Sequence, residues 1–360
     1  MIASAPVASH ALINLDWAGG DSGHTGRATI RNVMERVNIA QEILDDSAEK
    51  LTGNERKELD RFLYNKARNY GILPKSFYLC NVEKLQEHPI GGGSYGDVYK
   101  GRIGEQKVAV KISLFSGIPR RRDKSIGNCA RRHSFWKPLD HPNVLSFLGI
   151  CSEEFLSVGL VSPFMDNGDL PTYLRRNPII DKFDMAKQIC SGLAYLHNNE
   201  PEVIHGDLKC ANILVDDSGS PRIADFGLAR LVNAGTLTVG TGISGTLRWM
   251  APELVHPSVH GGDGHVNEKS DIYAFGMTCL EIYLRELPFH NLTDWEVVSM
   301  APNGSAPDRA LELTDDCSWL SKILSSSGST NPESRLLAQD IIAKTSRLHS
   351  SHEPPCVCRI

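Results

Sequence analysis

The sequence has 360 residues, of which 41% are hydrophobic and 22% charged, and its 38 Lys and Arg against 43 Asp and Glu give a formal net charge of −5. This composition excludes fibrous and wholly disordered proteins, and the mild acidity argues against a surface built to neutralise nucleic-acid phosphates. Because the chain shows neither an apolar run of roughly 18 residues nor a secretion signal, we expect no nucleic-acid or membrane contact and a cytoplasmic location, with the nucleus not excluded.

The first 80 residues predict a tail followed by two helices. Residues 1–28 show no periodicity, so we expect a disordered tail there. Residues 29–80 are expected to form a helical extension, with Asn54 capping its second helix and Gly71 ending it. This extension either packs only its own apolar stripe or docks on the following domain or on a partner. The stripe consists of Val33, Val37, Ala40, Leu44, Leu59, Phe62, Leu63 and Ala67.

The pattern changes at about residue 85. Residues 85–165 are rich in glycine and in alternating β-forming residues, whereas residues 166–344 show helical periodicity. A short tail, 345–360, follows. We therefore expect an α+β chain in which a small antiparallel sheet lobe precedes a larger helical lobe.

Two features of the sheet lobe are suited to a nucleotide. The stretch GGGSYGDV at 91–98 lets backbone amides approach a phosphate, because glycine has no Cβ to collide with it. Alternating residues follow this stretch, which indicates a hairpin tip and excludes a dinucleotide-binding fold, in which a helix would follow. Lys111 ends the alternating run and can hold phosphate oxygens as a fixed cation.

Two motifs of the helical lobe carry chemistry. In HGDLKCAN at 205–212, Asp207 can accept a hydroxyl proton. Asn212 and Asp225, the latter in DFG, offer hard oxygen ligands to magnesium. Each motif alone is common in turns and caps. Their occurrence in order, with the glycine loop and Lys111 before them and APE at 251–253 after them, is the signature set of protein kinases.

Residues 85–344 therefore resemble the eukaryotic protein kinases. The runs HPNVLSFLGI at 141–150, GTLRWMAPEL at 245–254 and SDIYAFGMTCLEI at 270–282 are most similar to the tyrosine-kinase-like group of serine/threonine kinases. The resemblance implies a two-lobed protein kinase fold, here with an N-terminal helical extension. It also implies transfer of the γ-phosphoryl group of ATP, bound with Mg²⁺, to Ser or Thr hydroxyls of protein substrates.

The resemblance further implies a role for each matching residue. Asp207 is the catalytic base or hydroxyl-orienting residue, Lys209 stabilises the transferring phosphate, and Asn212 and Asp225 hold the metal. Glu253 and Arg335 form a buried ion pair, and Asp271 hydrogen-bonds the catalytic loop. The residues implied to bind the nucleotide are Ile90, Gly91, Gly93, Gly96, Val98, Ala109, Lys111, Ser162, Met165, Asp169, Asn212 and Asp225.

The sequence departs from the family pattern in two places. A helix Glu should pair with Lys111, but its expected place falls near Arg132, and the only acids between Lys111 and His141 are Asp123 and Asp140. Three interpretations stay open: a weak kinase that uses another carboxylate, a non-catalytic pseudokinase acting as a binding scaffold or switch, and a translation fault between residues 112 and 140.

The second departure is Gly206, which stands where many kinases have an Arg that binds a phosphate on the activation segment. Control by such a phosphate is therefore in doubt. Four hydroxyl residues lie in that segment: Thr236, Thr238, Thr241 and Ser244. Two interpretations stay open for them, namely sites of phosphorylation and the ordinary Ser and Thr content of an exposed loop.

Overall fold

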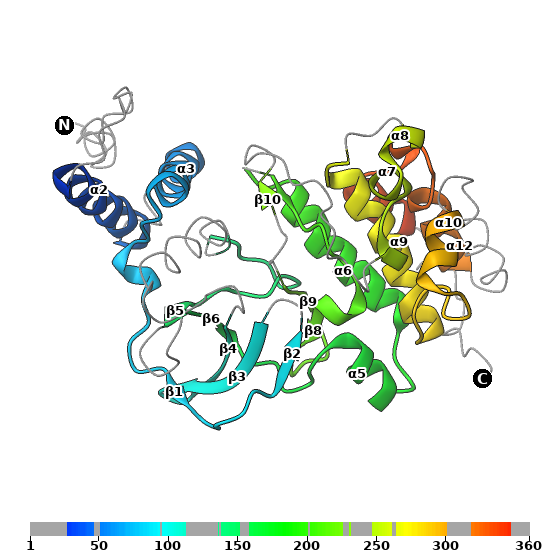
Figure 1. Ribbon diagram of the computed structural model, residues 1–360, viewed down its shortest axis with the longest axis horizontal. Helices are drawn as coiled ribbons and strands as arrows, with labels where there is room; N and C mark the ends of the chain where they lie inside the picture. The colour runs from blue at the N-terminus through cyan, green and yellow to red at the C-terminus, as the bar shows by residue number, and fades with distance from the viewer. Residues whose placement is uncertain are drawn as a thin grey trace, which may run out of the picture. The chain divides into compact units, whose positions relative to one another are not determined.

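The computed structural model describes residues 27–46, 51–93, 96–112, 136, 138–151, 158–200, 202–225, 230–231, 247–260, 264–300 and 318–346. They divide into two compact units, and Figure 1 labels most of their helices and strands. The sheet unit comes from Met1–Leu139 and Ser146–Phe164, and the helical unit from Asp140–Leu145 and Met165–Ile360. The division thus falls next to the expected lobe boundary at residue 165, and the described part of the N-terminal extension belongs to the sheet unit.

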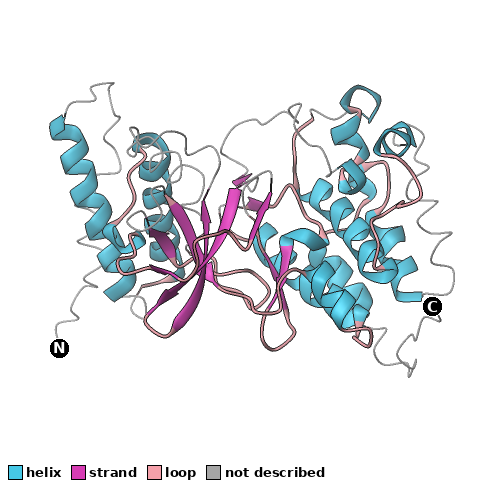
Figure 2. Ribbon diagram, turned by 60° about the horizontal axis from the view of Figure 1, so that its bottom comes forward, coloured by secondary structure: helices cyan, strands magenta, loops and turns pink. Residues whose placement is uncertain are grey.

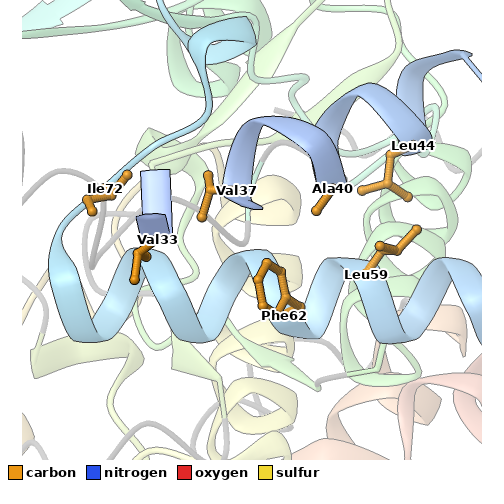
Figure 3. Close-up of a cluster of buried hydrophobic side chains, with 7 residues drawn as sticks. All are labelled: Val33, Val37, Ala40, Leu44, Leu59, Phe62 and Ile72. Atoms are coloured by element: carbon orange, nitrogen blue, oxygen red, sulfur yellow. The ribbon is translucent and has the colours of Figure 1, made fainter. Parts of the chain in front are cut away.

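The extension forms two helices, α2 (Arg27–Asp46) and α3 (Gly53–Tyr70). Helix α2 begins inside the segment expected as a tail, and residues 1–26 and 347–360 lie outside the described residues. The predicted apolar stripe is buried between the two helices, as Figure 3 shows. Its core consists of Val33, Val37, Ala40, Leu44, Leu59, Phe62 and Ile72.

The ends of α3 have well-defined caps. The prediction that Asn54 caps this helix is wrong: the N-cap is Thr52, whose side chain accepts from the backbone N–H of Glu55. The Glu55 carboxylate accepts in turn from the Thr52 backbone N–H at 2.8 Å, which completes a capping box. Gly71 ends the helix as predicted, in a left-handed conformation with φ of 66°.

A six-stranded antiparallel sheet forms the rest of the sheet unit (Figure 2). The strand order is β1-β3-β4-β6-β5, with β2 also paired to β3. Val108, Val110 and Val161 lie on one face of it, in a core with Val82 and Cys151. The strands are β1 (Glu83–Lys84), β2 (Gly91–Gly93), β3 (Gly96–Ile103), β4 (Gln106–Ile112), β5 (Gly149–Cys151) and β6 (Gly159–Pro163).

Residues 75–79, here called the linker, join the extension to the sheet. The linker begins with the 3₁₀ turn η1 (Lys75–Phe77), where the Lys75 backbone N–H donates to Asn38 Oδ1 of α2 at 2.9 Å. It then runs parallel to β5, where the Leu79 backbone N–H donates to the Ile150 carbonyl at 2.8 Å.

Side chains strengthen the join between the linker and the sheet. The ring of Phe77 packs edge-on against Phe147, which stacks on Trp136 at a centroid distance of 4.9 Å. Gly149 makes room for the linker, because a Cβ at that position would overlap the Phe77 carbonyl oxygen. The end of the extension, residues 75–79, therefore lies against the sheet, whereas helices α2 and α3 pack their own apolar stripe.

The helical unit is built around α9 (Glu268–Leu284), on which thirteen consecutive residues, Ser270–Ile282, are buried. Helix α6 (Lys182–His197) packs beside it and presents Met185, Ile189, Cys190 and Leu193 to the core. Two short antiparallel pairs, β8–β9 and β7–β10, complete the sheet content of this unit.

The remaining elements of the helical unit are short. The strands are β7 (Val203–Ile204), β8 (Ile213–Val215), β9 (Pro221–Ile223) and β10 (Arg230–Leu231), and the 3₁₀ turns are η4 (Cys210–Asn212), η5 (Leu247–Trp249) and η7 (Pro332–Ser334). The helices are α5 (Leu170–Arg176), α7 (Pro252–Val255), α8 (Pro257–His260), α10 (Asp294–Met300), α12 (Ser318–Ser327) and α13 (Ala338–Ser346).

Residues 140–145 belong to the helical unit, although their place in the sequence lies inside the expected sheet lobe. Backbone bonds at 2.8 Å tie Leu145 N–H to the Ile223 carbonyl, and Ile223 N–H to the Asn143 carbonyl. The Asn143 side chain donates to Gln188 Oε1 and to the Pro221 carbonyl, each at 3.1 Å. These bonds to α6 and β9 explain why residues 140–145 belong to the helical unit.

Candidate active site

The loop between β7 and β8 carries three of the predicted site residues. Asp207 is 3% exposed, and its carboxylate oxygens accept from Lys209 Nζ at 3.0 and 3.1 Å. Asn212 Nδ2 donates to Asp207 Oδ2 at 2.8 Å and to the Asp207 carbonyl at 2.7 Å. The loop therefore brings a nearly buried carboxylate, an ammonium group and an amide into one cluster.

The ring of His205, which is fully buried, connects this loop to the segment that carries Asp225. His205 Nδ1 accepts from the Asp207 backbone N–H at 3.2 Å, and Nε2 lies 2.8 Å from the Ala224 carbonyl. The Ala224 backbone N–H donates to the Asn212 carbonyl at 2.8 Å. Asp225 follows Ala224 in the left-handed conformation, with φ of 58°, which is uncommon for a non-glycine residue.

As predicted, the side chain of Asp271 in α9 supports the loop by accepting hydrogen bonds from the loop's backbone. Its carboxylate, which is 1% exposed, accepts the N–H groups of His205 at 2.7 Å and Gly206 at 2.8 Å. Gly206 has φ of 76°, a conformation that glycine adopts without strain. The absence of a side chain at Gly206 therefore suits the shape of the loop.

Asn212 and Asp225 offer oxygen atoms of the kind that Mg²⁺ prefers. Asn212 uses its NH₂ group on Asp207, so its Oδ1 is left as an acceptor. Within the described residues there is no group of three or more His, Cys, Asp or Glu side chains that could hold a metal ion by itself. One carboxylate and one amide oxygen suit Mg²⁺, which keeps waters and takes further ligands from substrate phosphates.

Five predicted nucleotide residues lie on or next to the sheet. Val98 pairs with Lys111 across β3 and β4, and Ala109 pairs with Ser162 across β4 and β6. Because directly opposite residues share a face, these four side chains lie on the face opposite Val108, Val110 and Val161. Ile90 precedes β2 and donates its backbone N–H to the Val98 carbonyl at 2.8 Å.

The three predicted glycines lie in the β2–β3 hairpin. Gly91 pairs with Val98 and Gly93 with Gly96, which confirms that the glycine loop is a hairpin tip. Gly96 adopts φ of 140°, which a residue with a Cβ rarely does. Ser94 and Tyr95 lie outside the described residues.

Met165 and Asp169 belong to the helical unit. Met165 follows the last residue of the sheet unit and is half-buried. Asp169 is the N-cap of α5, and its Oδ1 accepts from the Thr172 backbone N–H at 2.8 Å. The predicted nucleotide residues thus come from both units.

The two departures from the family pattern have different outcomes. Arg132 and residues 113–135, where the carboxylate partner of Lys111 was expected, lie outside the described residues, as do Thr236, Thr238, Thr241 and Ser244. Gly206 is described, and its backbone N–H is bonded to Asp271.

The predicted ion pair of Glu253 and Arg335 is confirmed. The guanidinium donates to both carboxylate oxygens, at 2.6 and 2.7 Å, and its side chain is fully buried. The same guanidinium donates to the Ser329 and Lys269 carbonyls.

The sequence reasoning missed Glu281, which supports the loop from a second position on α9. One oxygen of its carboxylate accepts the backbone N–H of Cys210 and Nε1 of Trp249, both at 3.0 Å. Burial raises the pKa of Glu281. A signal was present, because an acidic residue inside the apolar run IYAFGMTCLEIYL needs a buried partner.

Comparison with known proteins agrees with this arrangement. The sequence model of the family described as "Protein tyrosine and serine/threonine kinase" matches residues 85–345. This match confirms the resemblance predicted from the motifs and the α+β, two-lobed fold class that it implied.

Several curated proteins are similar over the same region. Serine/threonine-protein kinase STY46 of Arabidopsis thaliana is 34% identical over 61% of this chain and 37% of its own length, and serine/threonine-protein kinase CTR1 of the same plant is 33% identical over 58% and 25%. Dual specificity protein kinase shkA of Dictyostelium discoideum is 30% identical over 74% of this chain and 49% of its own. The chain therefore spans between a quarter and a half of these relatives.

Among the described residues, none of the helices combines the length and apolar character needed to cross a membrane. The cellular compartment stays a prediction.

Proposed function

Because this chain belongs to the family of protein tyrosine and serine/threonine kinases, we propose that it transfers the γ-phosphoryl group of Mg-ATP to Ser or Thr hydroxyls of protein substrates. The observation that carries the proposal is the cluster at Asp207, where a nearly buried carboxylate contacts both Lys209 and Asn212. Two of the relatives named above are serine/threonine kinases, which supports Ser or Thr as the acceptor.

In this proposal, Asp207 orients the acceptor hydroxyl. The hydroxyl oxygen attacks the γ-phosphorus, the bond to the β,γ-bridging oxygen breaks, and ADP leaves with the electron pair. The hydroxyl proton passes to the Asp207 carboxylate. Lys209, whose Nζ lies 3.0 Å from Asp207 Oδ2, offsets the negative charge of the transferring phosphate.

The nucleotide and metal are assigned residue by residue. Asn212 and Asp225 would hold Mg²⁺, which neutralises phosphate charge when bound. Lys111 would hold the α- and β-phosphates, and the hairpin glycines would admit them close to the backbone. Adenine and ribose would contact Ile90, Val98, Ala109, Ser162, Met165 and Asp169.

A second candidate is a pseudokinase, a scaffold or switch that transfers no phosphate. One sequence observation favours it: the only acidic residues between Lys111 and His141 are Asp123 and Asp140, so the usual Glu partner of Lys111 is missing. The same observation is compatible with a kinase in which another carboxylate pairs with Lys111.

A transfer assay with γ-labelled ATP and Mg²⁺ distinguishes the candidates. Wild type is compared with Asp207→Asn, and Asp217→Asn is the matched control because Asp217 is exposed in the β8–β9 turn. We expect label on Ser or Thr in wild type and control, and its loss in Asp207→Asn.

Two results would contradict the kinase proposal. One is the absence of transfer by a wild-type protein whose melting temperature still rises with Mg-ATP, which favours the scaffold. The other is transfer that Asp207→Asn retains.

A further inference from the structure

His197, the last residue of α6, contacts the support of the catalytic loop. Its Nε2 lies 3.0 Å from Asp271 Oδ2, and the side chains are 6% and 1% exposed. The other ring nitrogen, Nδ1, is buried and has no hydrogen-bond partner within the described part of the chain. The polar atoms of this ring therefore make one bond, the one to Asp271.

The Asp271 carboxylate is a buried charge that needs its donors. Oδ1 accepts from the Gly206 N–H, and Oδ2 accepts from the His205 N–H and from His197. Among the described residues, His197 is the one side chain that donates to this carboxylate. Loss of a donor leaves part of a buried anion unsatisfied, which weakens the support of the loop.

The bonds continue from Asp271 to the reacting groups. Asp271 holds the backbone of His205 and Gly206, and the His205 ring contacts the Asp207 N–H and the Ala224 carbonyl. Hydrogen bonds and the intervening residues Asp271 and His205 therefore connect His197 to both Asp207 and the residue before Asp225.

We propose that His197 is a positioning residue for phosphoryl transfer, acting through Asp271 on the catalytic loop. The proposal rests on the proposed kinase function. A residue needed only to fill space at the end of α6 could be apolar, and would not bury a nitrogen without a partner.

Three variants separate positioning from packing. His197→Leu keeps most of the volume but removes the donor, whereas His197→Gln keeps an N–H donor of similar reach. Tyr195→Phe is the matched control, since it removes another side-chain bond of α6, the one that the Tyr195 hydroxyl oxygen accepts from the Asp140 backbone N–H at 2.9 Å.

The first readout is transfer to casein as a general acceptor. We expect kcat to fall by about ten- to a hundred-fold in His197→Leu, because small misplacements of catalytic groups have effects of this size. The KM for ATP should stay within about two-fold of wild type, since the proposed nucleotide residues are unchanged. His197→Gln should recover most of kcat, and Tyr195→Phe should retain it.

The second readout is amide hydrogen exchange of the peptide 203–208, which needs no activity. We expect faster exchange in His197→Leu than in wild type and His197→Gln, because the N–H groups of His205 and Gly206 lose part of their acceptor's support. If wild type transfers no phosphate, the proposed function fails, and exchange still tests the positioning.

Three results would overturn the proposal for His197. The first is amide exchange of the peptide 203–208 in His197→Leu that is as slow as in wild type. The second is a fall of kcat in His197→Gln as large as that in His197→Leu, and the third is a similar fall of kcat in Tyr195→Phe. Melting temperatures of all variants show which are folded.

Discussion

The two units hold their residues by different means. In the helical unit, four acidic side chains are buried among the described residues. Asp207, Asp271 and Glu281 bond within or to the loop between β7 and β8, and Glu253 pairs with Arg335. In the sheet unit, the Asp and Glu side chains of the described residues are exposed or, like Asp60, only partly buried, and the strands are held by backbone ladders and an apolar core.

This difference predicts how each unit responds to substitution. A buried carboxylate that loses its donor is left uncompensated, so the helical unit should be sensitive to single polar changes. The sheet unit depends on the packing of apolar side chains and on close contacts between backbone segments. Its stability should therefore fall when a substitution adds atoms at such a contact, and should change little when an exposed charged side chain is removed. The following four predictions test this contrast.

The largest effect is expected when the buried ion pair is broken. Arg335→Met leaves the Glu253 carboxylate without the two guanidinium bonds, and should lower the free energy of unfolding by about 3–5 kcal/mol. Arg102→Met in the sheet unit is the control, because the Arg102–Glu83 side chains are 45% and 60% exposed and water screens such a pair, so its loss should change stability little. Urea unfolding measures both, and equal losses would contradict the contrast.

The next effect concerns the linker. In Gly149→Ala, the added Cβ would overlap the Phe77 carbonyl and lie 2.9 Å from Leu79 Cγ, so the linker must move away from β5. We expect a loss of about 1–3 kcal/mol, typical of overpacking, and faster proteolysis between α3 and β1. Gly53→Ala is the control, since a Cβ there meets no atom within 4 Å. Unchanged cleavage would show that the linker is not held at β5.

A smaller effect depends on pH and concerns Asp60 of α3. Burial raises the pKa of Asp60 from 3.8 to about 6, and Arg56 partly opposes this shift. Since the folded state binds this proton more tightly, stability should fall as pH rises from about 4 to about 6. Asp60→Asn removes this fall and should stabilise the protein by about 1–2 kcal/mol at pH 7.

Unfolding of wild type and Asp60→Asn at pH 4 and pH 7 measures this difference. A variant whose stability changes with pH as steeply as that of wild type would show that Asp60 ionises normally.

The smallest effect is expected at the start of α3. Thr52→Ala removes the acceptor of the Glu55 N–H and should cost about 1 kcal/mol. Asn54→Ala, at the position wrongly predicted as the cap, should cost less. A lower melting temperature for Thr52→Ala than for Asn54→Ala would support Thr52 as the N-cap, and the reverse order would support Asn54.

The sequence predicted those features that depend on local pattern. The stripe from Val33 to Ala67 and the Gly71 cap follow from spacing, and the glycine hairpin follows from the alternation after it. Thr52 was missed because Asn54 is as good a capping residue, and only the carboxylate of Glu55 three positions later decides between them.

Features that depend on distant contacts could not be predicted in this way. Asn143 joins the helical unit through Gln188 and Pro221, which lie 45 and 78 residues away. Asp271 and Arg335 were expected only because the motifs resemble a family. His197 and Glu281 have no local pattern that shows which backbone or side-chain groups they contact.

The docked linker has a consequence for thiol chemistry. Of the five described cysteines, Cys80 is exposed and follows the linker directly, whereas Cys151, Cys190, Cys210 and Cys279 are buried. Burial raises the pKa of Cys151 and Cys190 to about 12, which suppresses the reactive thiolate. With the cysteines outside the described residues replaced by Ser, a maleimide dye should label Cys80 first, and its fluorescence would report whether the neighbouring linker lies on the sheet.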